Sequence, residues 1–466
     1  MAEYYDVARK VCKRAVNTKY EDLRPNEIAG AKRSVLDAMG VILAGSSLGY
    51  KCLDVVKYVQ AKGGKEESTL FGFGGKYPAD MAAMANASMA HTLDFDDASE
   101  NQCHPTAASF PAAFALLESK GKASGKELIR CVVLANDFCE RFGWTSPATI
   151  QAGWLAPQLK GLFTSAFASG LALDLDEEGL MRCLGMALTQ ACGSAQVLQE
   201  GGNDVREIYQ AFAQRGGIFS AELTKLGIKG CLDSMEGKFG FFNNFLEGKT
   251  DLIDLSHMDV KQGDPFLSDA MCYKLYSSCR QTHPYIDAVR ELMAEHDDIR
   301  AENIAKINVQ VGGLGQMLCT PEESRMAPVN GNDARFSIPW TVAVTLVYGQ
   351  PSLGNFTPDG LEDQKVIDVA HLVEWESNAE LCAQKRNSSA IVTITLKNGV
   401  TYTNRCDDAV GCAEKPMTDD DFISKFKDCC SYTVKPMSEE KINKLLDLML
   451  NLDEVEDLAE ISALLN

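Results

Sequence analysis

The chain has 466 residues, of which 45 are Lys or Arg and 65 are Asp or Glu, so its formal net charge is −20. Hydrophobic residues make up 45% and charged residues 24%, which excludes a disordered or fibrous chain as a description of the whole. A single core stops growing near ~250–300 residues, so two domains are expected. The acidic charge opposes binding to nucleic acids and anionic membranes, and no basic patch interrupts it, so we predict neither partner.

The N-terminus and the cysteines indicate the compartment. The chain starts Met-Ala-Glu-Tyr-Tyr-Asp, without the basic and apolar regions of a secretory signal. Its apolar runs are shorter than the ~20 residues of a membrane span. Sixteen cysteines are scattered without a CxxC pair or finger-like spacing, which argues against zinc and iron–sulfur sites and predicts reduced, buried thiols. We therefore predict a cytoplasmic protein.

Residues 1–265 have the pattern of a helical domain. After Pro25, the apolar residues Ile28, Ala31, Val35 and Met39 recur at helical spacing. Ser124 and Glu127 form a capping box that predicts the start of another helix. Small or apolar residues predict further core helices at 79–90, 107–117, 164–173, 180–191 and 206–223.

The pattern changes after about residue 265. Residues 306–311 alternate as a strand does, and residues 390–404 predict a β-hairpin around Asn398-Gly399, with helices at 285–295 and 338–348 between them. Ser438 then caps a further amphipathic helix. The predicted fold is mainly α, with a large all-helical domain built from residues 1–265 and 406–466 and an inserted smaller α+β domain at 266–405.

A cluster of polar residues lies between the two alanine-rich helices predicted at 79–90 and 107–117. One interpretation is a general acid/base site in which a carboxylate orients His104. A second is a divalent metal bound by Asp94, Asp96 and Asp97, because hard cations prefer several oxygen ligands. A third is a solvated connection with an Asp cap and a buried histidine. The cluster comprises His91, Asp94, Asp96, Asp97, Glu100 and His104.

A second cluster, with Lys274, Arg280 and His283, lies at the start of the predicted insertion. These side chains would clamp a carboxylate, or they would form an exposed basic helix start. Arg206 and Arg335 offer further positive charge. The glycine-rich segments at 71–76 and 311–316 lack phosphate-loop spacing and predict tight turns.

Taken together, these segments resemble the MmgE/PrpD family. The most specific match is NASMAHTLDFDDASENQCHPTAASFP at 86–111, with its HTLDFDD block followed by HP. IAGAKRSVLDAMGVILAG at 28–45 resembles the family's N-terminal helix, and KLYSSCRQTHPYIDA at 274–288 its lysine- and histidine-containing segment. ARFSIPWTVAVTLVYG at 334–349 and the region 398–426 also match, so the resemblance runs nearly end to end.

The resemblance implies a fold, an assembly and a chemistry. Members include 2-methylcitrate dehydratase, cis-aconitate decarboxylase and iminodisuccinate epimerase. The implied enzyme needs no cofactor or metal, is a homodimer, and covers its helical domain with the smaller domain as a lid. The family's signature Asp, His and Lys fall on Asp94, His104 and Lys274, and its lid histidine falls on His283.

Three positions depart from the family pattern. Ala98 replaces the threonine of cis-aconitate decarboxylases, and Leu155 replaces a histidine that many members carry. Arg206 replaces a lysine, which keeps the positive charge, and Tyr209 occupies a histidine-like position. These departures argue against a strict cis-aconitate decarboxylase or 2-methylcitrate dehydratase.

The sequence therefore predicts a lyase, a dehydratase or decarboxylase that acts on a small di- or tricarboxylate by proton transfer next to a carboxylate. In this hypothesis His104 transfers the proton, Asp94 orients it, and Tyr209 is a second acid. The groups that hold the substrate carboxylates are Lys274, Arg206, His283, Arg280 and Arg335. Two alternatives stay open: an isomerase or epimerase of a small dicarboxylate, and a non-catalytic member that only binds a ligand.

Overall fold

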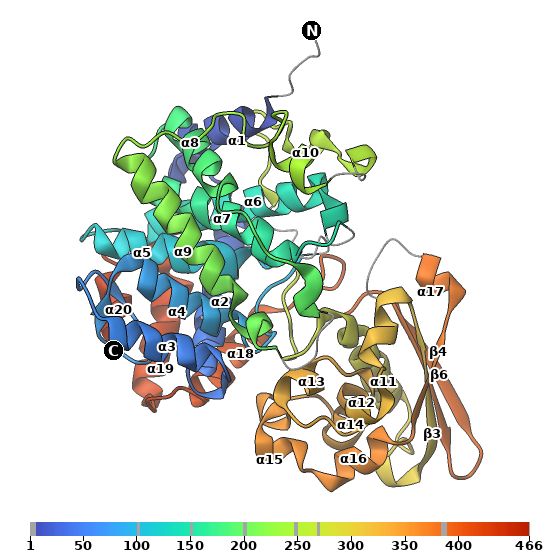
Figure 1. Cartoon of the computed structure of the whole chain (residues 1–466). Coiled ribbons are helices and arrows are strands. Elements are labelled where there is room, and N and C mark those ends of the chain that lie inside the picture. The colour runs from blue at the N-terminus through green and yellow to red at the C-terminus, as the bar shows by residue number, and fades with distance from the viewer. Residues whose placement is uncertain are drawn as a thin grey trace. The chain divides into compact units, whose positions relative to one another are not determined.

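The computed structural model describes residues 6–99, 103–149, 152–198, 203–246, 250–267, 271–383 and 389–465. The chain divides into two compact units (Figure 1). The first, which we call the helical unit, comprises Met1–Thr92, Asp96–Met271 and Asp419–Asn466. The second, which we call the α+β unit, comprises Leu93–Phe95 and Cys272–Thr418.

The helical unit is built around helices rich in small residues. Helices α4, α5 and α7 consist almost entirely of buried residues, as their alanine content predicts. Gly45 of α2 shows how closely the helices approach, since a Cβ there would lie 2.4 Å from the Met89 carbonyl oxygen of α4. The helices are α1 (Val7–Asn17), α2 (Pro25–Leu48), α3 (Cys52–Lys62), α4 (Ala79–His91), α5 (Pro105–Ser119), α6 (Gly125–Thr145), α7 (Ala156–Ala172), α8 (Glu177–Leu188), α9 (Val205–Lys225), α10 (Phe241–Phe245), α18 (Asp419–Ser431), α19 (Glu439–Leu450) and α20 (Ala459–Leu464).

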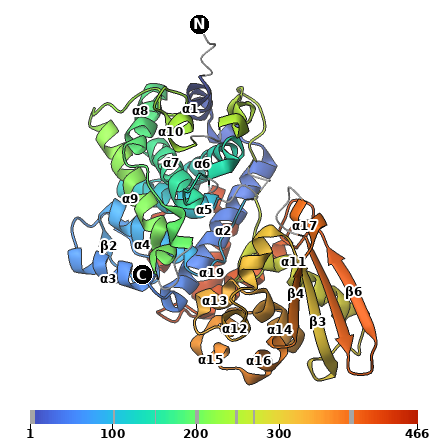
Figure 2. The same ribbon diagram turned by 45° about the vertical axis from the view of Figure 1, so that its right-hand side comes forward.

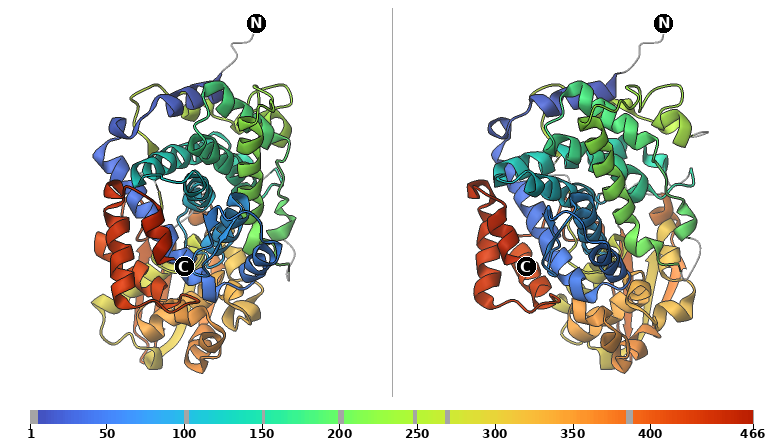
Figure 3. Two further views of the ribbon diagram at one scale, coloured as in Figure 1. Left: turned by 90° about the vertical axis from the view of Figure 1, so that its left-hand side faces the viewer. Right: turned by 60° about the vertical axis from the view of Figure 1, so that its left-hand side comes forward.

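The C-terminal helices complete the helical unit by packing beside α2. Both panels of Figure 3 show α18–α20, in red, next to the blue N-terminal helices. Lys425 of α18 and Asp37 of α2 form an ion pair of 2.6 Å, and both side chains are buried. A buried charge needs a partner, so this pair fixes the two chain ends against each other.

The α+β unit contains a four-stranded sheet in the order β4-β3-β5-β6. β3 is parallel to β4 and antiparallel to β5, and β5 and β6 form the hairpin. Figures 1 and 2 show the helices gathered on one face of this sheet, and β5 alternates buried and partly exposed residues accordingly. The elements are α11 (His283–Glu295), β3 (Ile304–Val311), α12 (Glu322–Met326), α13 (Gly331–Arg335), α14 (Ile338–Tyr348), α15 (Pro358–Leu361), α16 (Gln364–Ala370), β4 (Val373–Ser377), α17 (Ala379–Ala383), β5 (Ala390–Leu396) and β6 (Thr401–Cys406).

The mainly α fold is confirmed, and so are the strand at 306–311 and the hairpin with Gly399, whose φ is +87°, at its turn. The helical unit is not all-helical, because Ser68–Thr69 (β1) and Lys76–Tyr77 (β2) form a short antiparallel ribbon. The change between units falls at Met271–Cys272 and Thr418–Asp419, later than the predicted boundaries, and the α+β unit also includes Leu93–Phe95. That the α+β unit acts as a lid stays a prediction.

All sixteen cysteines are free thiols, and most are buried. In the part of the chain that the structure describes, no single helix is long and apolar enough to cross a membrane. The bent pair α2 and α3 passes that test by length and composition only, and most residues of α2 are buried within the fold.

We expect Lys425→Met to lower the free energy of unfolding by about 3–5 kcal/mol, because it leaves the Asp37 carboxylate buried without its cation. Urea unfolding followed by circular dichroism measures this. Arg33→Ala is the matched control, since Arg33 joins the same two helices through an exposed pair with Asp419 and its loss costs less than about 1 kcal/mol. Equal effects of the two variants would contradict the role assigned to the buried pair.

Candidate active site

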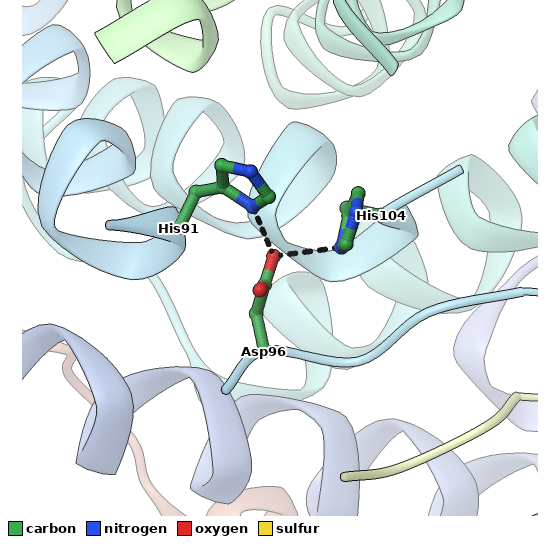
Figure 4. Close-up of side chains that lie close together, drawn as sticks. All are labelled: His91, Asp96 and His104. Atoms are coloured by element: carbon green, nitrogen blue, oxygen red, sulfur yellow. Dashed lines mark hydrogen bonds and ion pairs between the residues drawn. The ribbon is translucent and has the colours of Figure 1, made fainter. Parts of the chain in front are cut away.

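The candidate site of the helical unit lies where α4 ends and α5 begins. His91 is the last residue of α4, and His104 is the N-cap residue of α5. The Asp96 carboxylate lies between the two imidazoles (Figure 4). Its Oδ2 is 3.0 Å from Nδ1 of His91 and 3.1 Å from Nδ1 of His104. Asp96 is 1% exposed, so one buried carboxylate orients both rings.

The hydrogen bonds assign the tautomer of each histidine. Nδ1 of His104 also lies 2.8 Å from the Asp97 carbonyl oxygen, which only accepts, so this nitrogen carries the proton. Nδ1 of His91 donates to ionised Asp96, which leaves its Nε2 to accept from the Tyr209 hydroxyl at 2.7 Å. Neutral His104 therefore has its lone pair on Nε2, and that atom is the one able to accept a proton.

The pKa values of the neighbouring carboxyls of Asp96 and Asp97 are shifted in opposite directions. Burial opposes the charge of Asp96, but the imidazoles of His104 and His91 outweigh it and hold the pKa of this carboxyl well below its usual range. Burial raises the pKa of Asp97 to about 7, although hydrogen bonds from Thr106 favour the charged form. Asp96 is thus the permanent negative charge of the site.

The start of α5 is held by a network of polar side chains. Asp97 accepts from the Thr106 backbone N–H at 3.2 Å and from the Thr106 hydroxyl. Asn136 of α6 donates to the same hydroxyl at 2.9 Å, and the Gln214 amide of α9 donates to the carbonyls of Ala107 and Ala108. These hydrogen bonds hold the start of α5, of which His104 is the N-cap residue.

A second group of charges lies within the α+β unit. Lys274 Nζ forms an ion pair with the Asp94 carboxylate and lies 3.1 Å from the Asp94 carbonyl oxygen. The Lys274 side chain is 1% exposed, and Asp94 has a φ of +46°, which is uncommon for a residue other than glycine. The Ser277 hydroxyl donates to the Leu93 carbonyl at 2.8 Å and accepts from Arg335 Nε at 3.2 Å.

The other predicted binding residues have different surroundings. Arg280 donates to the carbonyls of Ala409 and Val410, at 3.1 Å each, and so supports that loop. His283 is fully buried, and burial together with the charges of Arg280 and Lys274 lowers its pKa well below the usual range. It is therefore a neutral side chain, and the exposed basic helix start is excluded for Lys274 and His283. Arg206 lies in the first turn of α9 and is partly exposed.

The sequence predicted proton-transfer roles for His104 and Tyr209, and it named His91 and Asp96 in the polar cluster without giving them such a role. His91 and Asp96 bring them together, whereas Asp94, which we expected to orient His104, pairs with Lys274. A solvated connection is contradicted in the part of it that the structure describes, because His91, Asp94, Asp96 and Asp97 are all buried. Glu100 lies outside the described residues.

The alternative interpretation, a metal site of Asp94, Asp96 and Asp97, is not formed. Among the described residues, two groups bring three possible metal-ligand atoms within 4.8 Å of one another. One is His91, Asp96 and His104, and the other is Asp408, Cys412 and Glu414. Asp94 and Asp96 are two residues apart, which in an extended segment would place both carboxylates on the same face. Asp94 has a positive φ, so the chain turns there, and the two carboxylates have different partners.

The departures from the family pattern have structural counterparts. Leu155 is 3% exposed at the start of α7, so an apolar side chain fills the position of the missing histidine. Ala98 is also buried. Tyr209, at the histidine-like position, contacts His91, with the two ring centroids 4.7 Å apart.

Comparison with known proteins identifies the family of the chain. The family model described as the MmgE/PrpD N-terminal domain matches residues 9–252, and the one for the C-terminal domain matches residues 276–452. Cis-aconitate decarboxylase of Aspergillus terreus is 27% identical, with 99% of this chain and 96% of the relative covered. Cis-aconitate decarboxylases of Homo sapiens and Mus musculus are 24% and 23% identical, each over 96% of this chain and 92% and 91% of their own lengths. The chain thus belongs to the MmgE/PrpD family.

Proposed function

We propose that the protein is a lyase that decarboxylates a small tricarboxylate by proton transfer, without a cofactor. The observation that carries the proposal is that Nδ1 of His104 faces both the Asp96 carboxylate and the Asp97 carbonyl oxygen, which fixes the tautomer of this ring and leaves Nε2 as the proton-transfer atom. The relatives support the substrate class, since several are cis-aconitate decarboxylases that align over nearly the whole chain.

The proposed step places a proton on carbon as carbon dioxide leaves. When the carbon–carboxylate bond breaks, carbon dioxide departs and the bonding electron pair stays on the substrate as a carbanion conjugated with a remaining carboxylate. The His104 imidazolium donates its Nε2 proton to that carbanion and becomes the neutral Nδ1–H tautomer. Before the proton is donated, the Asp96 carboxylate stabilises the imidazolium by its charge. After the donation it orients the neutral ring.

The substrate carboxylates need positive groups despite the net charge of −20. In the proposal Lys274, Arg206 and Arg335 supply them. Lys274 has three N–H donors, and the Asp94 carboxylate and carbonyl fix its ammonium in place. Arg280 and His283 are assigned a supporting role, because one holds a loop through two carbonyls and the other is buried and neutral.

An isomerase or epimerase is the second candidate, and the Tyr209–His91 pair favours it. Epimerisation needs two proton-transfer groups on opposite faces of the substrate, and the 2.7 Å hydrogen bond joins the Tyr209 hydroxyl to a histidine oriented by Asp96. A non-catalytic member remains the third candidate, favoured by the apolar Leu155. The homodimer and the cytoplasmic location stay part of the proposal, to be tested by sedimentation and by fractionation.

We expect His104→Gln to lower kcat/KM for a tricarboxylate by about 10²–10⁴-fold, because the variant lacks the proposed proton donor to the carbanion. Asp96→Asn should lower kcat/KM by a similar factor, since an amide disturbs the tautomer of His104 and does not stabilise its imidazolium. Carbon dioxide release measures both. Asp254→Asn is the matched control, because Asp254 and His257 form an exposed pair of the same type. Near-normal turnover by the His104 variant would remove His104 from the mechanism.

A panel of unsaturated tricarboxylates and hydroxy-, unsaturated and amino-dicarboxylates, followed by proton NMR in deuterium oxide, separates the candidates. We expect carbon dioxide and new vinyl signals with an unsaturated tricarboxylate. Deuterium at an α-carbon without net reaction would favour the isomerase. No change with any compound, while binding is still seen by calorimetry, would favour the non-catalytic member.

A further inference from the structure

We propose that His91, Asp96 and His104 also form a binding site for a divalent transition-metal ion such as Zn²⁺, and that the bound ion switches the enzyme off. The ligand atoms are Nδ1 of each histidine and Oδ2 of Asp96. The binding part of this inference stands on the geometry alone, and the inhibitory part rests on the proposed function.

The spacing of the three atoms suits a metal. They lie within 4.8 Å of one another, and Oδ2 is 3.0 Å and 3.1 Å from the two nitrogens. Metal–nitrogen bonds of ~2.0–2.1 Å place neighbouring ligand atoms about 3 Å apart in an octahedral site. Two imidazoles and one carboxylate on one face are also a recurrent ligand set for divalent transition metals.

The surroundings supply what a bound ion requires. The three side chains come from the end of α4, the start of α5 and the segment between them, so they converge from different directions (Figure 4). Their exposed fractions are 6%, 1% and 13%, which limits competition from water. The Tyr209 hydroxyl oxygen lies 2.7 Å from Nε2 of His91, so it can accept a hydrogen bond from the N–H that this nitrogen carries once Nδ1 binds the metal.

Metal binding would remove the function of His104 by moving its proton. In the metal-free enzyme Nδ1 carries the proton and Nε2 has the lone pair. Coordination of Nδ1 transfers the proton to Nε2, so Nε2 no longer accepts a proton, and a neutral coordinated ring is a weaker acid than an imidazolium. The ion also occupies the Asp96 oxygen that stabilises the imidazolium. In a neutral histidine only the position of the proton changes, whereas the imidazolium form of His104 would release its Nδ1 proton to solvent when the metal binds.

Thiols are the main competitors for the ion. Asp408, Cys412 and Glu414 form the other group of possible ligands, and Glu414 is exposed. Cys192, Cys231 and Cys382 are exposed as well. A site that contains one of these cysteines would bind the ion through sulfur, whereas the proposed site has only nitrogen and oxygen ligands. The absorption spectrum of bound Co²⁺ distinguishes the two kinds of site.

The test titrates the full-length protein with Co²⁺. We expect one ion per chain with visible d–d bands and no sulfur-to-cobalt charge-transfer band. His91→Gln and Asp96→Asn should abolish this signal, and Tyr209→Phe should weaken binding about 10-fold as an outer partner of His91. His257→Gln, at an exposed histidine, and Cys412→Ser should leave it unchanged. A charge-transfer band, a signal that survives in His91→Gln, or no binding would overturn the proposal.

A second measurement uses the unmodified sequence and does not depend on whether a variant folds. In protein with ¹⁵N-labelled histidine, Zn²⁺ should shift two of the six histidines from the Nδ1–H to the Nε2–H tautomer. Unchanged tautomers at saturating Zn²⁺ would overturn the site.

The activity assay tests the inhibitory part. We expect Zn²⁺ to abolish turnover in parallel with occupancy, and a chelator to restore it. Full turnover at full occupancy would overturn the switch while leaving the binding site. If no substrate is turned over without metal, the proposed function fails, and the Co²⁺ and tautomer measurements still decide the metal site.

Discussion

The candidate site depends on one buried carboxylate. Asp96 is almost inaccessible to solvent, and its charge is maintained by the imidazoles on either side of it. A buried carboxylate without such partners would become protonated, and the two rings would then lose the acceptor that orients them. The tautomer of His91 and the hydrogen bond that its Nε2 accepts from Tyr209 follow from this charge, and Asp96 together with the Asp97 carbonyl oxygen fixes the tautomer of His104.

Asp94 and Asp96 have partners in different units of the fold. Asp94 belongs to the α+β unit and is paired with Lys274, whereas Asp96 and Asp97 belong to the helical unit. Since Phe95 alone separates Asp94 from Asp96, a lysine-paired carboxylate and an imidazole-paired carboxylate are neighbours along the chain. The positive φ of Asp94 lies at this point, which is where backbone strain at functional sites is commonly found.

Local patterns predicted most of the fold but only part of the site. Alanine-rich segments, the capping box at Ser124 and the Asn398-Gly399 turn define elements through nearby residues, and these predictions hold. β4 was missed because its sequence, VEWES, is polar and pairs at a sheet edge with a distant strand. The link between Asp96 and His104, and the contact of Tyr209 with His91, depend on how α4, α5 and α9 pack, which spacing along the chain does not reveal. The family resemblance pointed to Asp94 and His104 and to a histidine-like position at Tyr209, and our hypothesis gave Asp94 the orienting role, whereas the carboxylate beside His104 is that of Asp96.

The buried polar cluster is better explained by chemistry than by stability. The Asp37–Lys425 pair and the Arg14–Asp137 pair each join segments far apart in the sequence, so they help to fix the topology. His91, Asp96 and His104 lie within fourteen positions of one another, and the covalent chain already holds them together. Burying these two imidazoles and the Asp96 carboxylate does little to fix the topology of the fold. It also carries a desolvation penalty that apolar residues would avoid. Residues retained under those conditions are the ones expected to act on a ligand, a substrate anion or a metal ion.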